Sequence, residues 1–244
     1  MHWKTNKNQE NLNKEVQINA YKLGDLRVVD LSKSLDPATE TRRCHLFRFN
    51  TGGAIPDYHT IIDITSHLGT HVECPYHHNS DWPDVTSIPL TSFMGRAIYT
   101  NFENAKPNSY ITPTMLDLIL GERLHENDIV ILDSPFKLPP FTEKTNTAED
   151  KRLFVNGETA VWLRDHKVKC VGFGDGVSIE NRNEDVCPFH NVLLAENILF
   201  IEVLKNLELL QSDIFFMSYS PLKIKGLDSS PVRAYAIEGM VEFS

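Results

Sequence analysis

The stretch of this chain best equipped for chemistry is Ser66–His78, SHLGTHVECPYHH, which holds four histidines and one acid. His67, His71, Glu73 and His77 all fall on odd positions. In an extended chain, a period of two would point these four side chains to one side. Imidazole nitrogens and a carboxylate oxygen are ligands that suit Zn²⁺ or Mn²⁺. The spacing therefore predicts a site for a divalent metal.

The residues between these candidate ligands argue against a long helix. Gly69 is permissive, Val72 is β-branched, and Pro75 does not fit a helix interior. The helical zinc motif H-E-x-x-H is missing from the sequence, which excludes that class of site. We therefore expect an extended or irregular segment that presents its imidazoles and its carboxylate to one cavity. Cys74 lies on an even position, so we expect it to point away from the ligands and to be buried.

Residues 67–77 also resemble a known signature. They read H-x-G-T-H-x-E-x-P-x-H, which is similar to the H-x-G-T-H-x-D-x-P-x-H pattern of the cyclase family. That family includes bacterial kynurenine formamidase and isatin hydrolase. One position departs from the pattern, because Glu73 stands where the family has Asp. The extra methylene extends the carboxylate by up to about 1.5 Å, which leaves both a bridging and a single-ion arrangement open.

A second group of candidate residues lies late in the chain. Pro188 is expected to open a helix that carries His190, and Glu202 interrupts the apolar run ILFIEVL. A buried carboxylate is costly unless it is paired or bound to a metal, so a structural salt bridge and a metal ligand are both compatible with Glu202. The family has a His followed twelve residues later by a Glu in a strand, and His190 and Glu202 match that spacing. The closing segment GLDSSPVRAYAI resembles the family as well, so the similarity spans roughly residues 26–237.

The resemblance implies a role for each matching residue. It implies a two-metal site in which His67 and His71 hold one ion, Glu73 bridges, and His190 and Glu202 hold the second ion. His77 would then exchange protons as an acid/base group rather than bind metal. One or two Zn²⁺ or Mn²⁺ ions per subunit are expected. The implied fold is the α/β fold of the family, with a mixed sheet, packed helices and assembly into a homodimer or a higher homo-oligomer.

Composition and sequence pattern limit the possible domain organisation, partners and location of the protein. The 244 residues, 41% apolar and 23% charged, fit one globular domain at 23–244 after a polar N-terminal arm at 1–22. The formal charge of −9 argues against a nucleic-acid partner, and no apolar run is long enough to span a membrane. The N-terminus lacks a signal pattern, and four cysteines without a C-x-x-C pair fit reduced thiols in a cytoplasm.

Strand and helix patterns alternate along the chain, which independently predicts an α/β fold. Strands are expected at 26–35, 58–65, 96–102, 128–133, 168–174 and 198–204, and helices at 112–120 and 157–165. Thr112 and Pro113 form a typical helix start. The segment 134–156 holds three prolines and no clear period, so we expect a loop that covers the substrate. His59, in the 58–65 strand, is expected to face solvent or a neighbour.

These observations predict a metal-dependent hydrolase of an amide or lactam C–N bond. His77 would take a proton from water and give it to the leaving nitrogen. An aryl formamide such as N-formylkynurenine is the leading candidate substrate. The alternatives are an isatin-type lactam hydrolase, a polyketide-type cyclase or dehydratase, and a catalytically silent metal-binding protein. An aromatic substrate pocket could be lined by Tyr76, His78, Trp82 and Phe136. Each of the three larger aromatic residues fits an ordinary core equally well, and His78 fits an exposed or supporting position, or a second acid/base group, as well.

Overall fold

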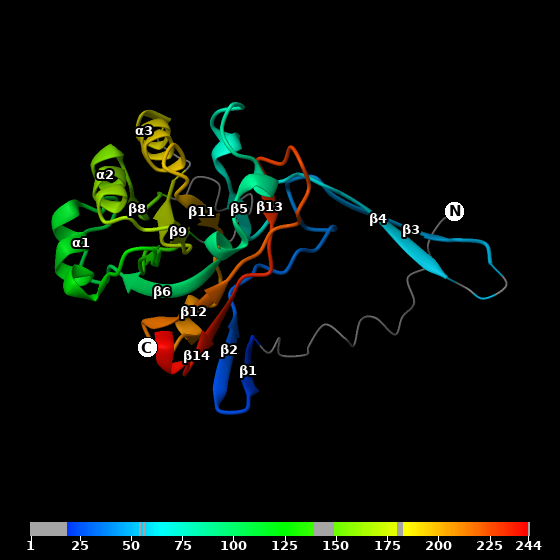
Figure 1. Cartoon of the computed structure of the whole chain (residues 1–244), viewed down its shortest axis with the longest axis horizontal. Helices are drawn as coiled ribbons and strands as arrows, with labels where there is room; N and C mark the ends of the chain where they lie inside the picture. The colour runs from blue at the N-terminus through cyan, green and yellow to red at the C-terminus, as the bar shows by residue number, and fades with distance from the viewer. Residues whose placement is uncertain (1–18, 54, 56, 139–148, 180–182, 244) are drawn as a thin grey trace.

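The computed structural model describes residues 19–53, 55, 57–138, 149–179 and 183–243 (Figure 1). Ten strands form one twisted sheet that runs through the body of the molecule. In spatial order they are β1 (Ala20–Leu23), β2 (Leu26–Asp30), β14 (Tyr235–Glu238), β12 (Ile214–Ser218), β6 (Met94–Asn101), β7 (Ile129–Asp133), β9 (Cys170–Phe173), β11 (Leu199–Glu202), β5 (His71–Glu73) and β13 (Ser229–Pro231). Two small two-stranded sheets add β8 (Leu153–Phe154) with β10 (Val177–Ser178), and β3 (Cys44–Asn50) with β4 (Tyr58–Ile64).

The centre of the large sheet is parallel and its two wings are antiparallel. Strands β6, β7, β9 and β11 pair in parallel, and the three connections between them contain α1 (Pro113–Ile119), α2 (Gly157–Asp165) and α3 (Asn183–Leu194). Parallel neighbours need such crossovers, and helices usually supply them. The mixed sheet with packed helices, predicted from the alternating pattern and the resemblance, is confirmed.

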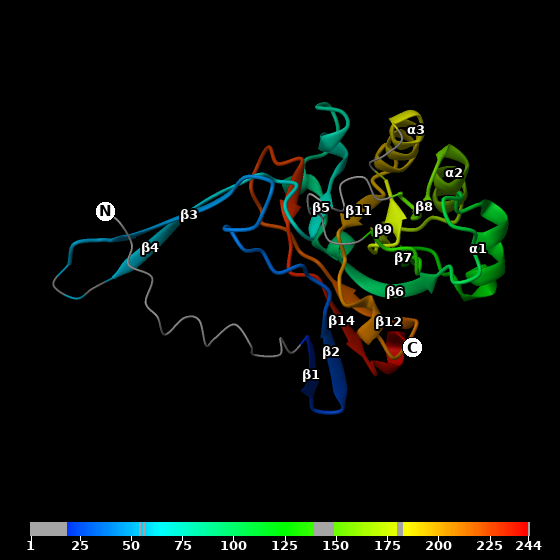
Figure 2. The same cartoon turned by 180° about the vertical axis from the view of Figure 1, so that it is seen from behind.

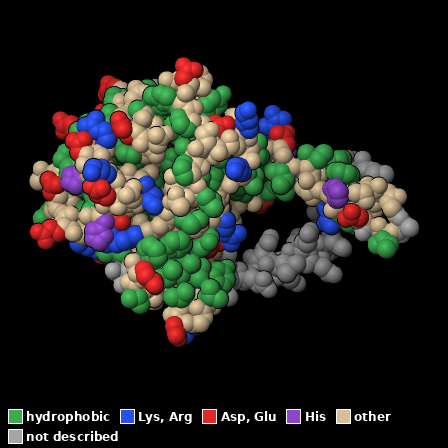
Figure 3. Space-filling view, viewed as in Figure 1, with side chains coloured by type: hydrophobic (Ala, Val, Ile, Leu, Met, Phe, Trp, Pro, Cys, Tyr) green, Lys and Arg blue, Asp and Glu red, His purple; other side chains and the backbone are tan. Residues whose placement is uncertain are grey.

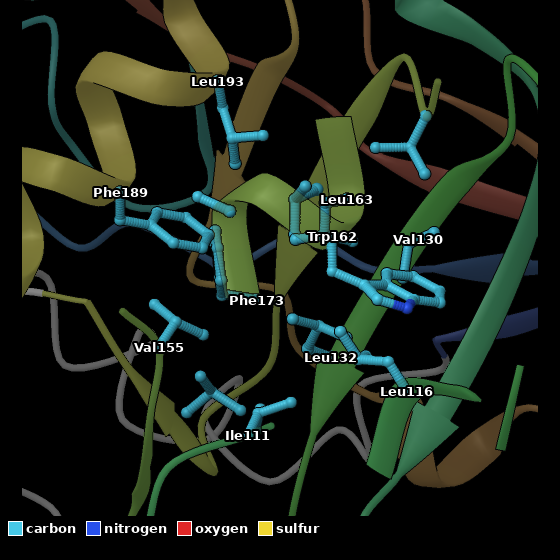
Figure 4. Close-up of a cluster of buried hydrophobic side chains, with 14 of the residues drawn as sticks. Ile111, Leu116, Val130, Leu132, Val155, Trp162, Leu163, Phe173, Phe189 and Leu193 are labelled. Atoms are coloured by element: carbon cyan, nitrogen blue, oxygen red, sulfur yellow. The ribbon is translucent and has the colours of Figure 1, made fainter. Parts of the chain in front are cut away.

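Both faces of the sheet are buried. In β7, Val130 and Leu132 face the cluster that the helices cover, whereas Ile129 and Ile131 face a second cluster on the other side. The helices fill the first cluster with side chains such as Trp162 from α2 and Phe189 from α3 (Figure 4). A central strand buried on both faces needs a continuous apolar run, and the sequence of β7 has one.

One helix start follows the predicted local chemistry, and another departs from the prediction. Thr112 accepts a hydrogen bond from the backbone N–H of Met115 at 3.3 Å, which confirms the predicted start of α1. The prediction that Pro188 opens a helix is wrong, because α3 begins at Asn183 and holds Pro188 in its interior. Proline removes one hydrogen bond to the carbonyl of Glu184, and that residue is exposed, so water can satisfy the carbonyl.

Three further expectations are matched only in part by the structure. Strand β1 begins at Ala20 and pairs with β2, so the sheet starts inside the segment assigned to the arm, while residues 1–18 lie outside the described ranges. The expected covering loop contains β8, and its residues 139–148 also lie outside the described ranges. The predicted strand 58–65 exists as β4, but it pairs with the unforeseen β3 in a separate hairpin. Within the described ranges, each helix is too short or too polar to cross a bilayer.

Candidate metal centre

The candidate ligands meet at the edge of the sheet where β5 lies between β11 and β13. In the pairing of β5 with β11, Glu202 stands opposite His71. On the other side of β5, Ser229 stands opposite Glu73. Strand pairing therefore joins the early histidine-rich segment to two segments that are more than a hundred residues away along the chain.

Only part of the early segment is extended. Within β5, His71 and Glu73 point to the same side, as the odd spacing predicted. His67 precedes a turn at Gly69, whose φ of +60° favours glycine, and a Cβ at this position would come within 2.6 Å of Cδ2 of Leu35 unless that side chain moved. His77 closes the short 3₁₀ helix Pro75–His77. The segment is therefore irregular, and a single strand does not explain how all four side chains gather.

The carboxylate of Glu73 lies at the middle of the cluster, and its two oxygens face different imidazoles. Oε1 lies 2.7 Å from Nδ1 of His67 and 3.5 Å from Nε2 of His71. Oε2 lies 3.5 Å from Nε2 of His190 and 3.9 Å from Nε2 of His77. Glu73 thus joins two groups of potential ligands, one with His67 and His71 and one with His77 and His190. The longer side chain, compared with the family's Asp, still reaches both groups.

Two of the histidines are held with one ring nitrogen directed into the cluster. Nδ1 of His71 donates to the carbonyl of Gly69 at 2.8 Å, and Nδ1 of His190 donates to the carbonyl of Val186 at 2.8 Å. A carbonyl only accepts, so these bonds fix the tautomer and leave each Nε2 with a lone pair. Such bonds are the usual outer support of a metal-binding histidine.

Two buried atoms in the cluster lack a hydrogen-bond partner, namely Nε2 of His71 and Oε2 of Glu73. Buried polar atoms are almost always satisfied, and an unsatisfied one needs an explanation such as an ion. A lone pair on nitrogen and a carboxylate oxygen are donors that a divalent cation would satisfy at once. The residues present therefore fit a divalent metal.

Glu202 lies at the margin of this arrangement. It is 6% exposed, and its Oε2 is 3.6 Å from Nε2 of His71. Among the described residues, Glu202 belongs to none of the three-residue groups of potential metal ligands. Its carboxylate nevertheless faces His71, which forms one such group with His67 and Glu73. The structure thus brings together His67, His71, Glu73, His77 and His190 and places Glu202 beside them.

Asp228 also belongs to the cluster, and the sequence analysis missed it. Its Oδ2 lies 2.8 Å from Nε2 of His67 and 3.3 Å from Nδ1 of His77. The pairing of β13 with β5 places it there, and its backbone carbonyl accepts from the N–H of Cys74 at 2.9 Å. The signal was available, because Asp228 is the one acid in the closing segment that resembles the family.

A hydrogen bond also ties the two ligand-bearing strands together. The hydroxyl of Thr70 donates to the carbonyl of Val203 at 2.7 Å and accepts from the N–H of Lys33 at 2.8 Å. Val203 follows Glu202 and has a φ of +60°. A β-branched residue in this region is strained, and such strain persists only where the surroundings enforce it. Thr70, next to His71, therefore holds the turn that follows Glu202.

We expect Thr70→Val to weaken metal binding by about 10–100-fold, the range seen when outer support of a ligand is lost. The methyl group fills the space of the hydroxyl but leaves the Val203 carbonyl without its donor. Thr70→Ser is the matched control, because it keeps the hydroxyl and should retain affinity. A competition titration against a chromogenic chelator measures both variants. Equal affinities for the two would contradict this role.

Charges in the cluster shift the pKa values of several of its members, among them His67 and Glu73. Burial opposes protonation of His67, but hydrogen bonds to Glu73 and Asp228 outweigh it and raise the pKa of His67 above 6.5. Burial would raise the pKa of Glu73, but the imidazoles of His190, His67 and His71 hold that pKa well below 4.5. The metal-free cluster is therefore stabilised by a negative Glu73 beside a positive His67.

This pairing predicts how the stability of the chelated protein depends on pH. A raised folded-state pKa at His67 contributes stability that is present below 6.5 and is lost as the pH rises through that pKa. The lowered pKa of Glu73 contributes stability that is lost as the pH falls below 4.5. Thermal unfolding of chelated protein should therefore show a falling Tm above pH 6.5. Asp228→Asn should flatten this fall, and an unchanged slope would contradict the assignment.

The residues suggested for a substrate pocket are spread out. Tyr76 is half-buried, and the ring of His78 stacks on His190 at 5.6 Å. Trp82 and Phe136 pack against the core cluster under the helices. This position matches the alternative that the two residues belong to an ordinary hydrophobic core. Cys74 is buried in the core cluster on the other face of the sheet, as predicted. The side chain of His59 is 61% exposed, which also agrees with the prediction.

Two cavities are lined by candidate ligands, and Val203 lines both of them. One, of about 100 Å³, is lined by Arg152, Asp175 and Glu202. The other, of about 170 Å³, is lined by Lys33, Arg42, His67 and His71. A larger cavity of about 730 Å³ lies away from the cluster, between α2 and α3. Charged side chains therefore lie beside candidate ligands in both of the smaller cavities.

A family model described as Cyclase matches residues 29–181, which is more than half of the sequence. The chain belongs to the Cyclase family. Among curated relatives of this cyclase-family protein, kynurenine formamidase of Salinibacter ruber is 26% identical over 222 residues, covering 86% of this chain and 96% of its own length. Kynurenine formamidase of Bordetella petrii is 26% identical over 182 residues, covering 71% of this chain and 77% of its own.

Solved structures of the same fold agree with this membership. An isatin hydrolase bound to the product analogue thioisatinate has a TM-score of 0.70 at 17% identity and covers 89% of this chain and 94% of its own. Isatin hydrolase A from Labrenzia aggregata has a TM-score of 0.68 at 20% identity and covers 88% and 94%. At these identities the likeness establishes the fold of this cyclase-family chain, and the chemistry is argued from its own residues.

Proposed function

We propose that this cyclase-family protein is a metal-dependent hydrolase that cleaves an amide C–N bond, with an aryl formamide such as N-formylkynurenine as the leading substrate. The observation that carries the proposal is the pair of unsatisfied buried atoms, Nε2 of His71 and Oε2 of Glu73, at the centre of four imidazoles. The similarity to two kynurenine formamidases, over 86% and 71% of this chain, supports the choice of substrate.

The donor set supports two Zn²⁺ or Mn²⁺ ions, joined by Glu73. His67 and His71 would hold one ion together with Oε1, and His190 would hold the other together with Oε2. Glu202, which the resemblance assigns to the second ion, lies 3.6 Å from Nε2 of His71 in the first group. When bound, such ions polarise the substrate carbonyl and lower the pKa of water from about 15.7 to about 7. The carboxylate oxygens already divide between the two groups of imidazoles, which favours the bridging arrangement that the sequence left open.

His77 is the group best placed to move protons. Its Nδ1 faces Asp228 at 3.3 Å, its Nε2 faces the cluster 3.9 Å from Glu73, and its side chain is 31% exposed. The carboxylate of Asp228 can orient the His77 ring by accepting a hydrogen bond from Nδ1–H. Nε2 is then unprotonated and can act as a base. Nε2 would take a proton from the attacking water and deliver it to the leaving nitrogen. The products are formate and an aryl amine.

One assay tests this function. Purified protein, loaded with Zn²⁺ or Mn²⁺, is incubated with N-formylkynurenine, N-formylaniline and isatin, and chelated protein is the control. We expect formate release from the formamides with loss of activity on chelation and recovery on adding metal. Cleavage of isatin alone would reassign the enzyme to lactams, and a product with no added water would reassign it to a cyclase or dehydratase.

A metal-replete protein that turns over none of these compounds would favour the silent metal-binding alternative. Two further expectations stay predictions, namely the cytoplasmic location and the lack of a nucleic-acid partner. The first is supported by Cys44, Cys74, Cys170 and Cys187, which are all free thiols.

A further inference from the structure

The cavity of about 170 Å³ beside His67 and His71 carries three charged side chains that the proposed proton transfers do not use. These are Lys33, Glu40 and Arg42. They belong to the segment between β2 and β3, which Figures 1 and 2 show between the sheet and the β3–β4 hairpin in both views. Charged groups beside a reaction centre can bind a part of the substrate that does not react, and such binding contributes to catalysis and selectivity.

Hydrogen bonds and an ion pair hold these side chains at the cavity. Nζ of Lys33 lies 2.8 Å from Oε2 of Glu40, whose side chain is 9% exposed. The backbone N–H of Lys33 donates to the hydroxyl of Thr70, in the histidine-rich segment, at 2.8 Å. The guanidinium of Arg42 donates to the backbone carbonyl of His67 at 2.6 Å. Both cationic residues are therefore attached to the segment that carries the proposed ligands.

The balance of charge distinguishes this cavity from the smaller one beside Glu202. Two cations, Lys33 and Arg42, stand against one carboxylate in the larger cavity. In the smaller cavity Arg152 stands against two carboxylates, and the carboxylate of Asp150 also binds its guanidinium at 2.9 and 3.0 Å. Figure 3 shows Lys and Arg side chains where the β3–β4 hairpin joins the body of the molecule. An anionic group is therefore attracted to the larger cavity rather than to the smaller one.

We propose that Lys33, Glu40 and Arg42 bind an α-amino acid group on the substrate and make the enzyme selective for zwitterionic aryl formamides. This inference rests on the proposed function and adds the residues that choose among its substrates. The carboxylate of an α-amino acid group can accept hydrogen bonds from Lys33 and Arg42, because ammonium and guanidinium groups only donate. Its ammonium can donate to Glu40. A cavity of about 170 Å³ has room for several water molecules, so a group of this size fits.

The length of N-formylkynurenine agrees with this placement. About seven bonds of roughly 1.3–1.5 Å separate its formyl carbon from its carboxylate carbon, a reach of up to about 9 Å. The cavity adjoins the cluster, because His67 and His71 belong to both. A substrate whose formyl group lies at the cluster can therefore extend its α-amino acid group into the cavity. N-formylaniline carries no charge and has no such extension, so it gains nothing from the three charged side chains.

Calorimetric titration of the metal-loaded full chain with kynurenine, the product that keeps the α-amino acid group, tests the proposal. We expect kynurenine to bind about 10–100-fold more tightly than its methyl ester, which lacks the negative charge, because hydrogen bonds between charged groups are the strong ones. Lys33→Gln should lose most of this preference while its amide still donates to Glu40. Lys167→Gln is the matched control, because it breaks an exposed pair of the same kind, with Glu126 at 2.6 Å, and should keep the preference.

Kinetics of the loaded enzyme give a second measurement. Lys33→Gln should raise the KM for N-formylkynurenine by about 10-fold or more, with little change in kcat, because the charges act on a part of the substrate that does not react. The KM for N-formylaniline should stay at the wild-type value. Circular dichroism and elemental analysis establish that each variant is folded and holds its metal.

Equal affinities of the wild type for kynurenine and its methyl ester, or no binding of kynurenine, would overturn the proposal. A preference that survives in Lys33→Gln but is lost in Arg152→Gln would place the group in the cavity beside Glu202 and would overturn it as well. Kynurenine binds without turnover, so the two proposals fail separately. Selective kynurenine binding without formate release would refute the hydrolase alone, and formate release with equal KM values for both formamides would refute the selectivity alone.

Discussion

Replacing His77 by alanine is expected to lower kcat by about 10²–10⁴-fold while the purified protein keeps its metal. The loss corresponds to about 3–5 kcal/mol in the barrier. The expectation follows from the geometry, because Asp228 holds Nδ1 and leaves Nε2 directed toward the cluster at a partly exposed position. Steady-state kinetics together with elemental analysis of the same preparation measure both parts.

Two other histidines serve as controls for this variant. His59→Ala removes an imidazole from the exposed hairpin and should leave kcat unchanged. His78→Ala removes a ring that stacks on His190, and a loss as large as that of His77→Ala would make His78 the proton carrier. If His77→Ala is purified without metal, His77 is a ligand and the proton must move through another group. Partial rescue by added imidazole would support the acid/base role directly.

Replacing Glu73 by glutamine is expected to abolish activity and to lower metal affinity by more than about 100-fold, since even outer support of a ligand contributes about 10–100-fold. Glutamine has nearly the same shape but no charge, and it presents an N–H₂ group to some of the imidazoles that need an acceptor. The buried carboxylate of Glu73 is the group that contacts both sets of histidines. Metal stoichiometry by elemental analysis should fall from two ions per chain to one or none.

Glu73→Asp separates charge from length at the same position. It restores the family's residue and keeps the charge, but it shortens the reach by about 1.5 Å. We expect it to retain at least one ion. A Glu73→Gln protein with full metal content and normal kcat would show that Glu73 serves only as an ion-pair partner for His67, and the bridging role would be lost.

The sequence was most informative where chemistry is local. The odd spacing and the resemblance led to the histidine-rich segment, and Thr112 with Pro113 located the start of α1. Asp228 was missed because its role arises only when β13 pairs with β5, and its position as the one acid of the closing segment was the only signal that pointed to it. The start of α3 was missed because Pro188 is a strong local signal that tertiary packing overrides, and Phe189 and Leu193 are fully buried around it.

The arrangement of β5 has a consequence for biosynthesis. This strand has three residues, and both of its neighbours, β11 and β13, come from the last fifth of the chain. Contacts between residues so distant in sequence form late, because a long loop must close before they gain anything. A growing polypeptide that has emerged only as far as α2 therefore has its histidine-rich segment exposed and unpaired. We expect ion capture to follow release from the ribosome rather than to nucleate folding.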